Sequence, residues 1–177
     1  MVQENTKEGY ALKVRVKFAK EGVMKFIGHL DIMRYFQKAV KRANLDVAFS
    51  EGFSPHMIMS FASPLGVGIT STGEYFDMEL KSATTSSDMV KRLNDAMAEG
   101  MKILSIRQVE DGKASKAMSL VAAADYRLKF RETAKLPENW KEKLEEFKAQ
   151  KEIVILKKTK KSEKELDIRP FIYKLSL

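Results

Sequence analysis

The sequence contains no cysteine, and this absence excludes several classes of site at once. Disulfide frameworks, thiolate zinc sites, cysteine nucleophiles and cysteine-ligated iron–sulfur clusters all need a sulfur that the chain lacks. Long apolar runs are also absent, and a transmembrane helix needs ~20 such residues. The N-terminal sequence MVQENTKEGY is polar and has no apolar segment of the kind found in secretory signals. We therefore expect a cytoplasmic protein that does not engage a membrane.

The composition that remains is that of a basic globular protein. The chain has 177 residues, 44% of them hydrophobic, which suits one domain or two small ones. Its 32 lysines and arginines exceed its 24 aspartates and glutamates, so the formal net charge is +8. Clustered cations favour a polyanionic partner, because contacts to phosphates release counterions. A solvated basic surface is the alternative, and the positions of the charges decide between the two.

Hydrophobic periodicity predicts an α+β fold over residues 10–110, after a polar tail at 1–9 that we expect to be disordered. The expected strands cover residues 12–18, 47–49, 57–61, 74–80 and 103–109, and the expected helices cover 29–43 and 86–98. The apolar stripe of the first helix is expected to comprise Leu30, Met33, Phe36, Val40 and Ala43. The order of elements matches a ferredoxin-like split βαβ unit, an antiparallel sheet with both helices on one face.

A second, partial unit is predicted after a linker at 111–124. Residues 125–177 repeat the opening pattern of the chain, with a strand at 126–131, a helix at 137–149 and a strand at 153–156. A partner strand begins near Leu166. The second ferredoxin-like unit is therefore either a half-unit or a truncated one, and the apolar pattern that runs to Leu177 favours truncation.

Two predicted strands each place three cations on one side of the pleat. We expect the strands at 12–18 and 126–131 to line one exposed wall, with further cations from the helix at 29–43. The expected phosphate contacts are Lys13, Arg15, Lys17, Arg34, Lys38, Arg127 and Lys129. The aromatic signature of the RNA recognition module is absent, so the strands predict phosphate contacts and not base stacking on the sheet.

A set of polar residues forms the candidate pocket. His29 either caps the helix at 29–43, with Asp31 in its first turn, or faces the pocket as a general base or ligand. His56, in the loop at 51–56, is the other histidine. The two histidines are too far apart in sequence for a local metal motif, so we expect neither a metal nor a cofactor. The candidate pocket residues are Gly28, His29, Asp31, Ser54, Pro55, His56, Ser60 and Glu74, of which His29, Asp31, His56 and Glu74 are the candidate catalytic groups.

Several short motifs occur in order along the chain: FIGHLD at 26–31, GFSPH at 52–56, PLGVG at 64–68 and DIRPFI at 167–172. With these motifs the chain resembles the radical-SAM-linked protein family, a domain of unknown function that is encoded beside a radical SAM protein or fused to it. The resemblance implies a radical SAM protein as partner. Since radical SAM chemistry needs three thiolates and this chain has no cysteine, it cannot run that reaction itself.

Three functions from different classes follow. The leading hypothesis is an accessory RNA-binding module that presents tRNA or rRNA to a radical SAM modifying enzyme. The second is a small-molecule enzyme in which His29 or His56 acts as general base, helped by Asp31. The third is a protein–protein adaptor that joins the radical SAM partner through the GFSPH loop.

Overall fold

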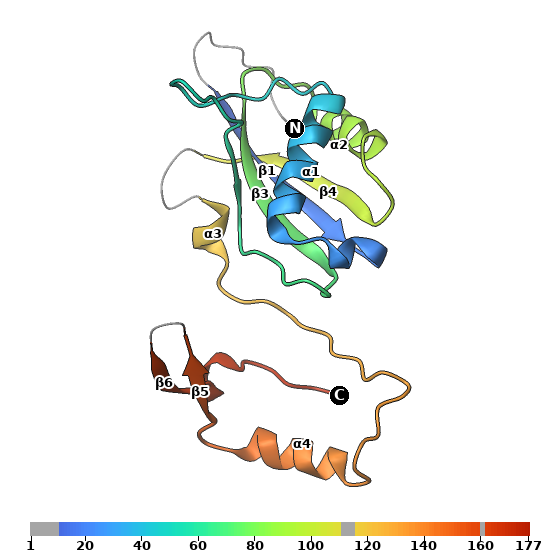
Figure 1. The fold of residues 1–177 in the computed structure, drawn as a ribbon, viewed down its shortest axis with the longest axis vertical. Helices are drawn as coiled ribbons and strands as arrows, with labels where there is room; N and C mark the ends of the chain where they lie inside the picture. The colour runs from blue at the N-terminus through green and yellow to red at the C-terminus, as the bar shows by residue number, and fades with distance from the viewer. Residues whose placement is uncertain (1–10, 111–115, 160–161) are drawn as a thin grey trace. The chain divides into compact units, whose positions relative to one another are not determined.

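The computed structural model describes residues 11–110, 116–159 and 162–177. The predicted tail at 1–9 and the first part of the predicted linker, 111–115, lie outside this range. The chain divides between Asp125 and Tyr126 into two units, which are described separately (Figure 1). Within the described range, none of the helices combines the length and the apolar character that crossing a bilayer requires.

The first unit has the ferredoxin-like α+β fold that the sequence predicts. Its elements run in the order β1 (Leu12–Lys20), α1 (His29–Arg42), β2 (Met59–Phe61), β3 (Ser71–Leu80), α2 (Ser86–Asp95) and β4 (Met101–Gln108). The strands form one antiparallel sheet in the order β2-β3-β1-β4. Both α1 and α2 cover the same face of this sheet (Figure 1). The opposite face, which neither of these helices covers, is called the open face below. A 3-10 helix, η1 (Gly22–Phe26), joins β1 to α1.

The alternation in β1 sets which side chains meet the helices. Val14, Val16 and Phe18 are buried in the core, as expected, and the cations between them project to the open face. The predicted strand at 47–49 is wrong as an element: only two isolated bridges form, Val47 to Leu80 and Phe49 to Met57. The loop that follows has Gly52 in a left-handed conformation (φ 104°), which ends pairing there.

Four phenylalanine rings form the centre of the core. Phe36 of α1 lies 4.7 Å from Phe18 and 4.8 Å from Phe76, measured between ring centroids, and Phe61 stacks on Phe76 at 4.9 Å. The buried residues of α1 are Ile32, Phe36, Ala39 and Val40. The prediction that Leu30 belongs to this stripe is wrong, because Leu30 is 67% exposed. At 3.6 residues per turn it lies about 120° around the helix from Phe36.

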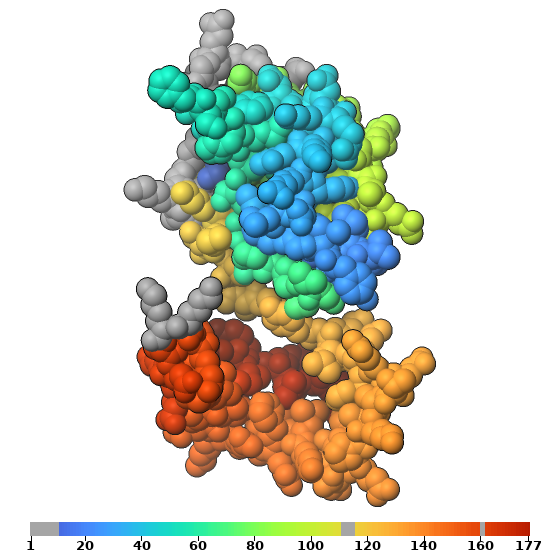
Figure 2. All heavy atoms as spheres, in the orientation of Figure 1, coloured from blue at the N-terminus to red at the C-terminus, as the bar shows by residue number. Residues whose placement is uncertain are grey.

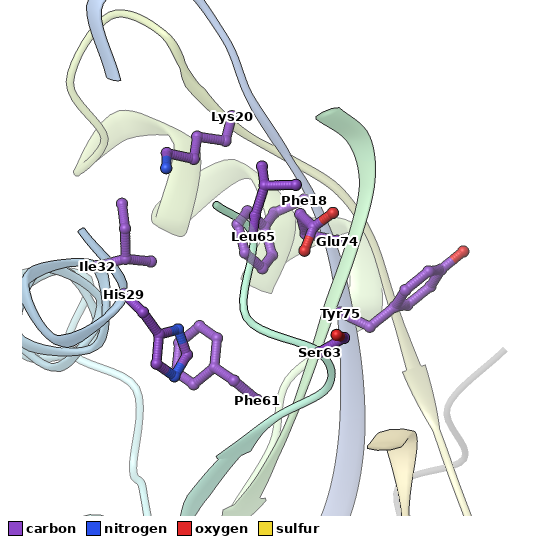
Figure 3. A pocket seen from close by; sticks show the side chains of 9 residues that line it. All are labelled: Phe18, Lys20, His29, Ile32, Phe61, Ser63, Leu65, Glu74 and Tyr75. Atoms are coloured by element: carbon purple, nitrogen blue, oxygen red, sulfur yellow. The ribbon is translucent and has the colours of Figure 1, made fainter. Parts of the chain in front are cut away.

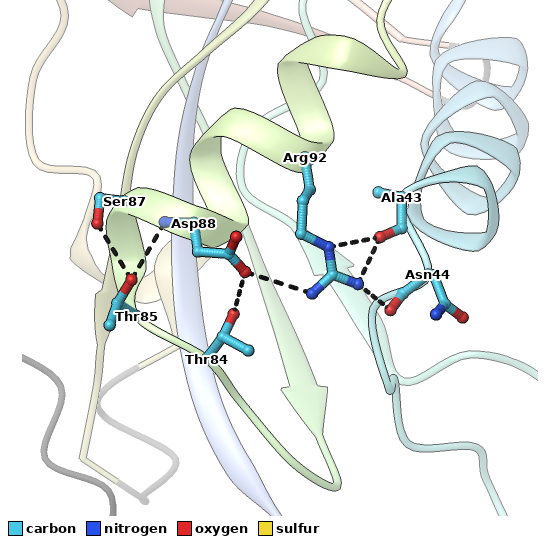
Figure 4. A network of polar contacts seen from close by, with 7 residues as sticks. All are labelled: Ala43, Asn44, Thr84, Thr85, Ser87, Asp88 and Arg92. Atoms are coloured by element: carbon cyan, nitrogen blue, oxygen red, sulfur yellow. Dashed lines mark hydrogen bonds and ion pairs between the residues drawn. The ribbon is translucent and has the colours of Figure 1, made fainter.

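Arg92 of α2 ties the two helices together by binding the C-terminal end of α1 (Figure 4). Its guanidinium donates to the carbonyl oxygen of Ala43 at 3.0 and 2.7 Å and also to that of Asn44. The last carbonyl oxygens of a helix receive no hydrogen bond from within the helix, so an outside donor such as Arg92 can satisfy them. Asp88, whose pKa is lowered chiefly by a hydrogen bond from Thr84, holds the guanidinium from the other side at 3.4 Å.

The turn between α2 and β4 is built closely against the end of β1. Gly100 has φ 86°, and a Cβ atom at this position would lie 2.6 Å from the carbonyl oxygen of Glu21.

On the outer edge of the sheet, the Asn94 side chain accepts from the Ile103 N–H at 2.8 Å and donates to the Ile103 carbonyl at 3.1 Å. The amide thereby takes the place of a neighbouring strand at this residue.

The second unit contains α4 (Trp140–Ala149) and a hairpin of β5 (Val154–Lys158) and β6 (Glu163–Asp167), followed by the 3-10 helix η3 (Arg169–Phe171). The predicted strand at 126–131 is wrong. β5 and β6 pair only with each other, so this segment has no neighbouring strand to complete a ladder. The hairpin is closed by Asp167, whose carboxylate accepts from the backbone N–H groups of Ile153 and Arg169, and these hydrogen bonds lower its pKa.

Candidate nucleic-acid interface

The open face of the sheet carries cations from two neighbouring strands. Lys13 and Lys17 project there from β1, and the same face receives Lys102 and Arg107 from β4, two residues that the sequence pattern did not single out. Lys17 lies over the ring of Tyr75, with its Nζ 5.7 Å from the ring centroid. The same face also carries Glu79 opposite Lys13 and Asp77 opposite Arg15, so these carboxylates offset part of its positive charge.

Arg15, the central cation of β1, is engaged within the protein. Its Nε and Nη2 donate to the two carboxylate oxygens of Asp77 at 2.8 and 3.1 Å, and Asp77 also accepts from the Ala117 N–H at 2.8 Å. The pKa of Arg15 is raised, first by this hydrogen bond and also by the charge of Asp77. The contact to Ala117 brings the short helix α3 (Ala117–Leu120) onto this face. The predicted phosphate contact at Arg15 therefore loses its support.

The predicted α1 cations lie on a different surface of the first unit from Lys13 and Lys17, and a common wall with residues 126–131, which belong to the second unit, stays a prediction. Arg34 and Lys38 are exposed on α1, on the helix side of the sheet and away from Lys13 and Lys17. Arg34 also pairs with Asp31 at 3.3 Å, near the start of the same helix. Arg127 and Lys129 belong to the second unit, where they are exposed on a segment that forms no strand.

The formal charge is divided unequally between the two units. Residues 126–177 contain 15 lysines and arginines against nine aspartates and glutamates, a net charge of +6. Residues 1–125 contain 17 against 15, a net charge of +2. The smaller unit therefore carries most of the net positive charge, +6 of +8, and total charge alone did not reveal this.

A small pocket lies between the start of α1 and the sheet (Figure 3). Lys20, His29, Ser63 and Glu74 are its polar lining, and Phe18, Ile32, Phe61, Leu65 and Tyr75 complete it. Its volume of ≈ 20 Å³ is room for about one water molecule. A ligand of ordinary metabolite size does not fit such a space, so the pocket gives no support to the small-molecule enzyme hypothesis.

The structure brings only two of the predicted pocket residues together, His29 and Glu74. Gly28, and not His29, is the N-cap of α1, so the capping interpretation of His29 is wrong. The His29 ring instead meets Phe61 edge-on at 5.7 Å. Asp31 is exposed.

The remaining predicted pocket residues lie elsewhere. His56 Nδ1 is 2.8 Å from Ser50 Oγ, in the same exposed loop as Ser54 and Pro55. Ser60 is exposed on β2, where it pairs with Asp77. In the part of the chain that the structure describes, histidine and carboxylate side chains form no group that could hold a metal ion.

Lys20 is the pocket residue that sequence reasoning missed. Its side chain is only 2% exposed, and its Nζ donates to the Ile27 carbonyl at 2.8 Å, just before α1 begins. Burial lowers the pKa of Lys20, and the charge of Glu74 opposes this effect. The predicted strand ends at Phe18, whereas β1 continues to Lys20, and the alternation of the strand places Lys20 on the same buried face as Val16 and Phe18.

We expect the stability of the protein to report the burial of Lys20 in the alkaline range. Because the folded pKa is lowered from 10.5, the folded state disfavours the protonated amine. The resulting destabilisation is fully present below the folded pKa and is lost as pH rises through it toward the unfolded value. Relative to Lys20→Met, the wild type should therefore gain stability as pH rises through the lowered folded pKa of Lys20 toward its unfolded value of 10.5. Urea denaturation of both proteins across this range measures the difference, and a constant difference would contradict the assignment.

Comparison with known proteins adds a family. Residues 13–177 match the family described as "Uncharacterized protein conserved in bacteria (DUF2344)", so the match includes both units. No curated protein matches the sequence. Because the matched region covers nearly the whole chain, this protein belongs to the DUF2344 family of bacterial proteins.

Proposed function

We propose that this protein is an RNA-binding accessory module that works in the cytoplasm with a radical SAM enzyme acting on tRNA or rRNA. The observation that carries the proposal is the net charge of +6 concentrated in residues 126–177. A charge density of this kind favours a polyanion, because each phosphate contact releases counterions into solution. The resemblance of the FIGHLD and GFSPH motifs to radical-SAM-linked proteins supports the enzyme partner.

Exposed cations of the second unit are the candidates for phosphate contact. Arg127, Lys129 and Arg131 follow one another at alternate positions, and all three are exposed. Lys157 is exposed on β5, whereas the neighbouring Lys158 pairs with Glu163 at 2.8 Å. On the first unit, Lys13 and Lys17 of the open sheet face stay candidates. Because the phosphate group is the same in every nucleotide, contacts to phosphates predict affinity for RNA without strong sequence preference.

Salt titration of RNA binding tests the proposal on the full chain. The double variant Arg127→Gln/Lys129→Gln removes two exposed cations of the second unit. The slope of log K against log salt is negative, and each phosphate contact contributes about 0.7–0.9 to its magnitude. If both residues contact phosphates, the slope of the double variant should therefore be shallower than that of the wild type by roughly 1.5. Affinity for a structured tRNA at low salt should fall severalfold at least. Fluorescence anisotropy with labelled tRNA provides the measurement.

The matched control is Lys41→Gln/Lys81→Gln, which removes the same charge from two exposed positions of the first unit. This variant should keep the wild-type slope. Absence of RNA binding at low salt, or equal slopes for the two double variants and the wild type, would overturn the proposal. Co-purification with a radical SAM protein in the absence of RNA binding would favour the adaptor hypothesis instead.

The adaptor hypothesis has one structural observation in its favour. Phe53 is fully exposed at the tip of the GFSPH loop. Two further hydrogen bonds between Ser50 and His56 close the base of this loop, from Ser50 N–H to the His56 carbonyl at 2.9 Å and from His56 N–H to Ser50 Oγ at 3.1 Å. An aromatic side chain held out on a tied loop is a suitable anchor for a protein partner.

A further inference from the structure

We infer that the segment Tyr126–Arg131 is a binding site for single-stranded RNA, in which Tyr126 stacks on a base and the intervening cations contact phosphates. This inference rests on the proposed function and deepens it by naming the strandedness of the ligand. It starts from a segment whose local pattern is that of a strand but which belongs to neither sheet of the described chain.

Apolar and cationic residues alternate along this segment, and both kinds are accessible; the apolar positions are two aromatic residues with Leu128 between them. Tyr126 is 80% exposed and Phe130 is 55% exposed. Arg127 and Lys129 lie between them and are exposed as well. Exposed aromatic side chains are suited to contact with a partner, and the adjacent cations favour an anionic one. A nucleic-acid strand supplies a planar base for the ring and a phosphate for each cation.

The segment is anchored at one end, which prepares it for binding. The ring of Phe130 meets Trp140 of α4 in a T-shaped contact with centroids 5.9 Å apart. Lys141 lies over the same indole, its Nζ 5.7 Å from the ring centroid. Phe130 is thus held by the helix, and Tyr126 remains the ring with a free face. The entropy lost on binding is smaller for an anchored segment than for one that must order completely.

Single strands suit this site better than duplexes do. In an A-form duplex the base faces are stacked on one another, and a side chain reaches only edges, sugars and phosphates. In a single strand every base offers a face to an aromatic ring, and such stacking tolerates any sequence. A loop or an end of a structured RNA presents both the unstacked base and the dense phosphates that the second unit favours.

The test compares a labelled single-stranded RNA with a duplex of the same sequence, using the full chain. For Tyr126→Ala, single-strand affinity should fall about tenfold, and the ratio of single-strand to duplex affinity should fall with it. The salt slope should stay at the wild-type value, because no charge is removed. Tyr126→Phe, which keeps the ring, should restore the single-strand affinity. Phe53→Ala removes another exposed aromatic ring, from the first unit, and is the matched control, expected to bind as the wild type does.

The outcomes separate this inference from the proposed function. Wild-type affinity of Tyr126→Ala for the single strand, or equal losses on single strand and duplex, would overturn the stacking site while leaving the electrostatic proposal intact. Failure of the wild type to bind either RNA would remove both. Because Tyr126 is exposed, Tyr126→Ala should have the same thermal unfolding curve as the wild type. Measuring this curve checks that the variant keeps its fold.

Discussion

Replacing Asp77 with alanine should lower the free energy of unfolding by about 3–5 kcal/mol, one of the two largest effects that we expect in this protein. The carboxylate is 4% exposed and accepts hydrogen bonds from three donors on two partners: two from Arg15 and one from the backbone of Ala117. Its removal leaves a cation in a poorly solvated position beside the sheet. The cost arises from that charge more than from the lost attraction between the pair.

The double variant Arg15→Leu/Asp77→Leu separates these two contributions. Because it removes both charges, it should be more stable than Asp77→Ala, and urea denaturation measures both. Hydrogen exchange at the Ala117 amide provides a second measurement, since this N–H loses its acceptor in either variant. A loss below about 1 kcal/mol in Asp77→Ala would mean that the pair behaves like a surface ion pair.

Replacing Phe36 with alanine should cost about 3–5 kcal/mol, comparable with the loss at Asp77. Its side chain is fully buried, and its ring contacts Phe18, Phe61 and Phe76 from the helix side of the core. Truncation removes the apolar area of the ring and leaves a cavity that the surrounding rings fill only in part. Chemical denaturation, with the slope m checked for constancy, measures this loss.

Leu30→Ala is the matched control on the same helix. Leu30 is exposed, so this truncation should change the free energy of unfolding by no more than about 0.5 kcal/mol. The comparison is sharp because sequence periodicity assigned both side chains to one buried stripe. A larger loss for Leu30→Ala than for Phe36→Ala would place the core on the wrong side of α1.

Local pattern was sufficient to predict most of the first unit. The alternation from Leu12 to Phe18 and the helical spacing of Phe36 and Val40 each reflect burial of one face. In the first unit these two faces pack against each other between the sheet and α1. The error at Leu30 came from counting spacings of three and four without following the angle around the helix. The error at 47–49 came from a short apolar run whose pairing ends in the loop that follows.

The candidate site was less predictable, because it depends on contacts between residues distant in sequence. Arg15 and Asp77 are 62 residues apart, and nothing near Arg15 indicates that a carboxylate on β3 lies opposite it. Lys20 continues the buried face of β1 beyond Phe18, but a lysine does not match the apolar alternation that predicted the strand. The segment at 126–131 has the composition of a strand, but a strand also needs a neighbour, and local pattern does not supply one.

The Asn94 amide has a consequence for how other molecules can approach the first unit. Exposed sheet edges are templates on which foreign peptides add as an extra strand, and this is a common route both to recognition and to aggregation. At Ile103 the donor and the acceptor of β4 are already occupied by one side chain. Strand addition at this position would first have to displace the amide. The Asn94 side chain therefore opposes strand addition at this residue of β4.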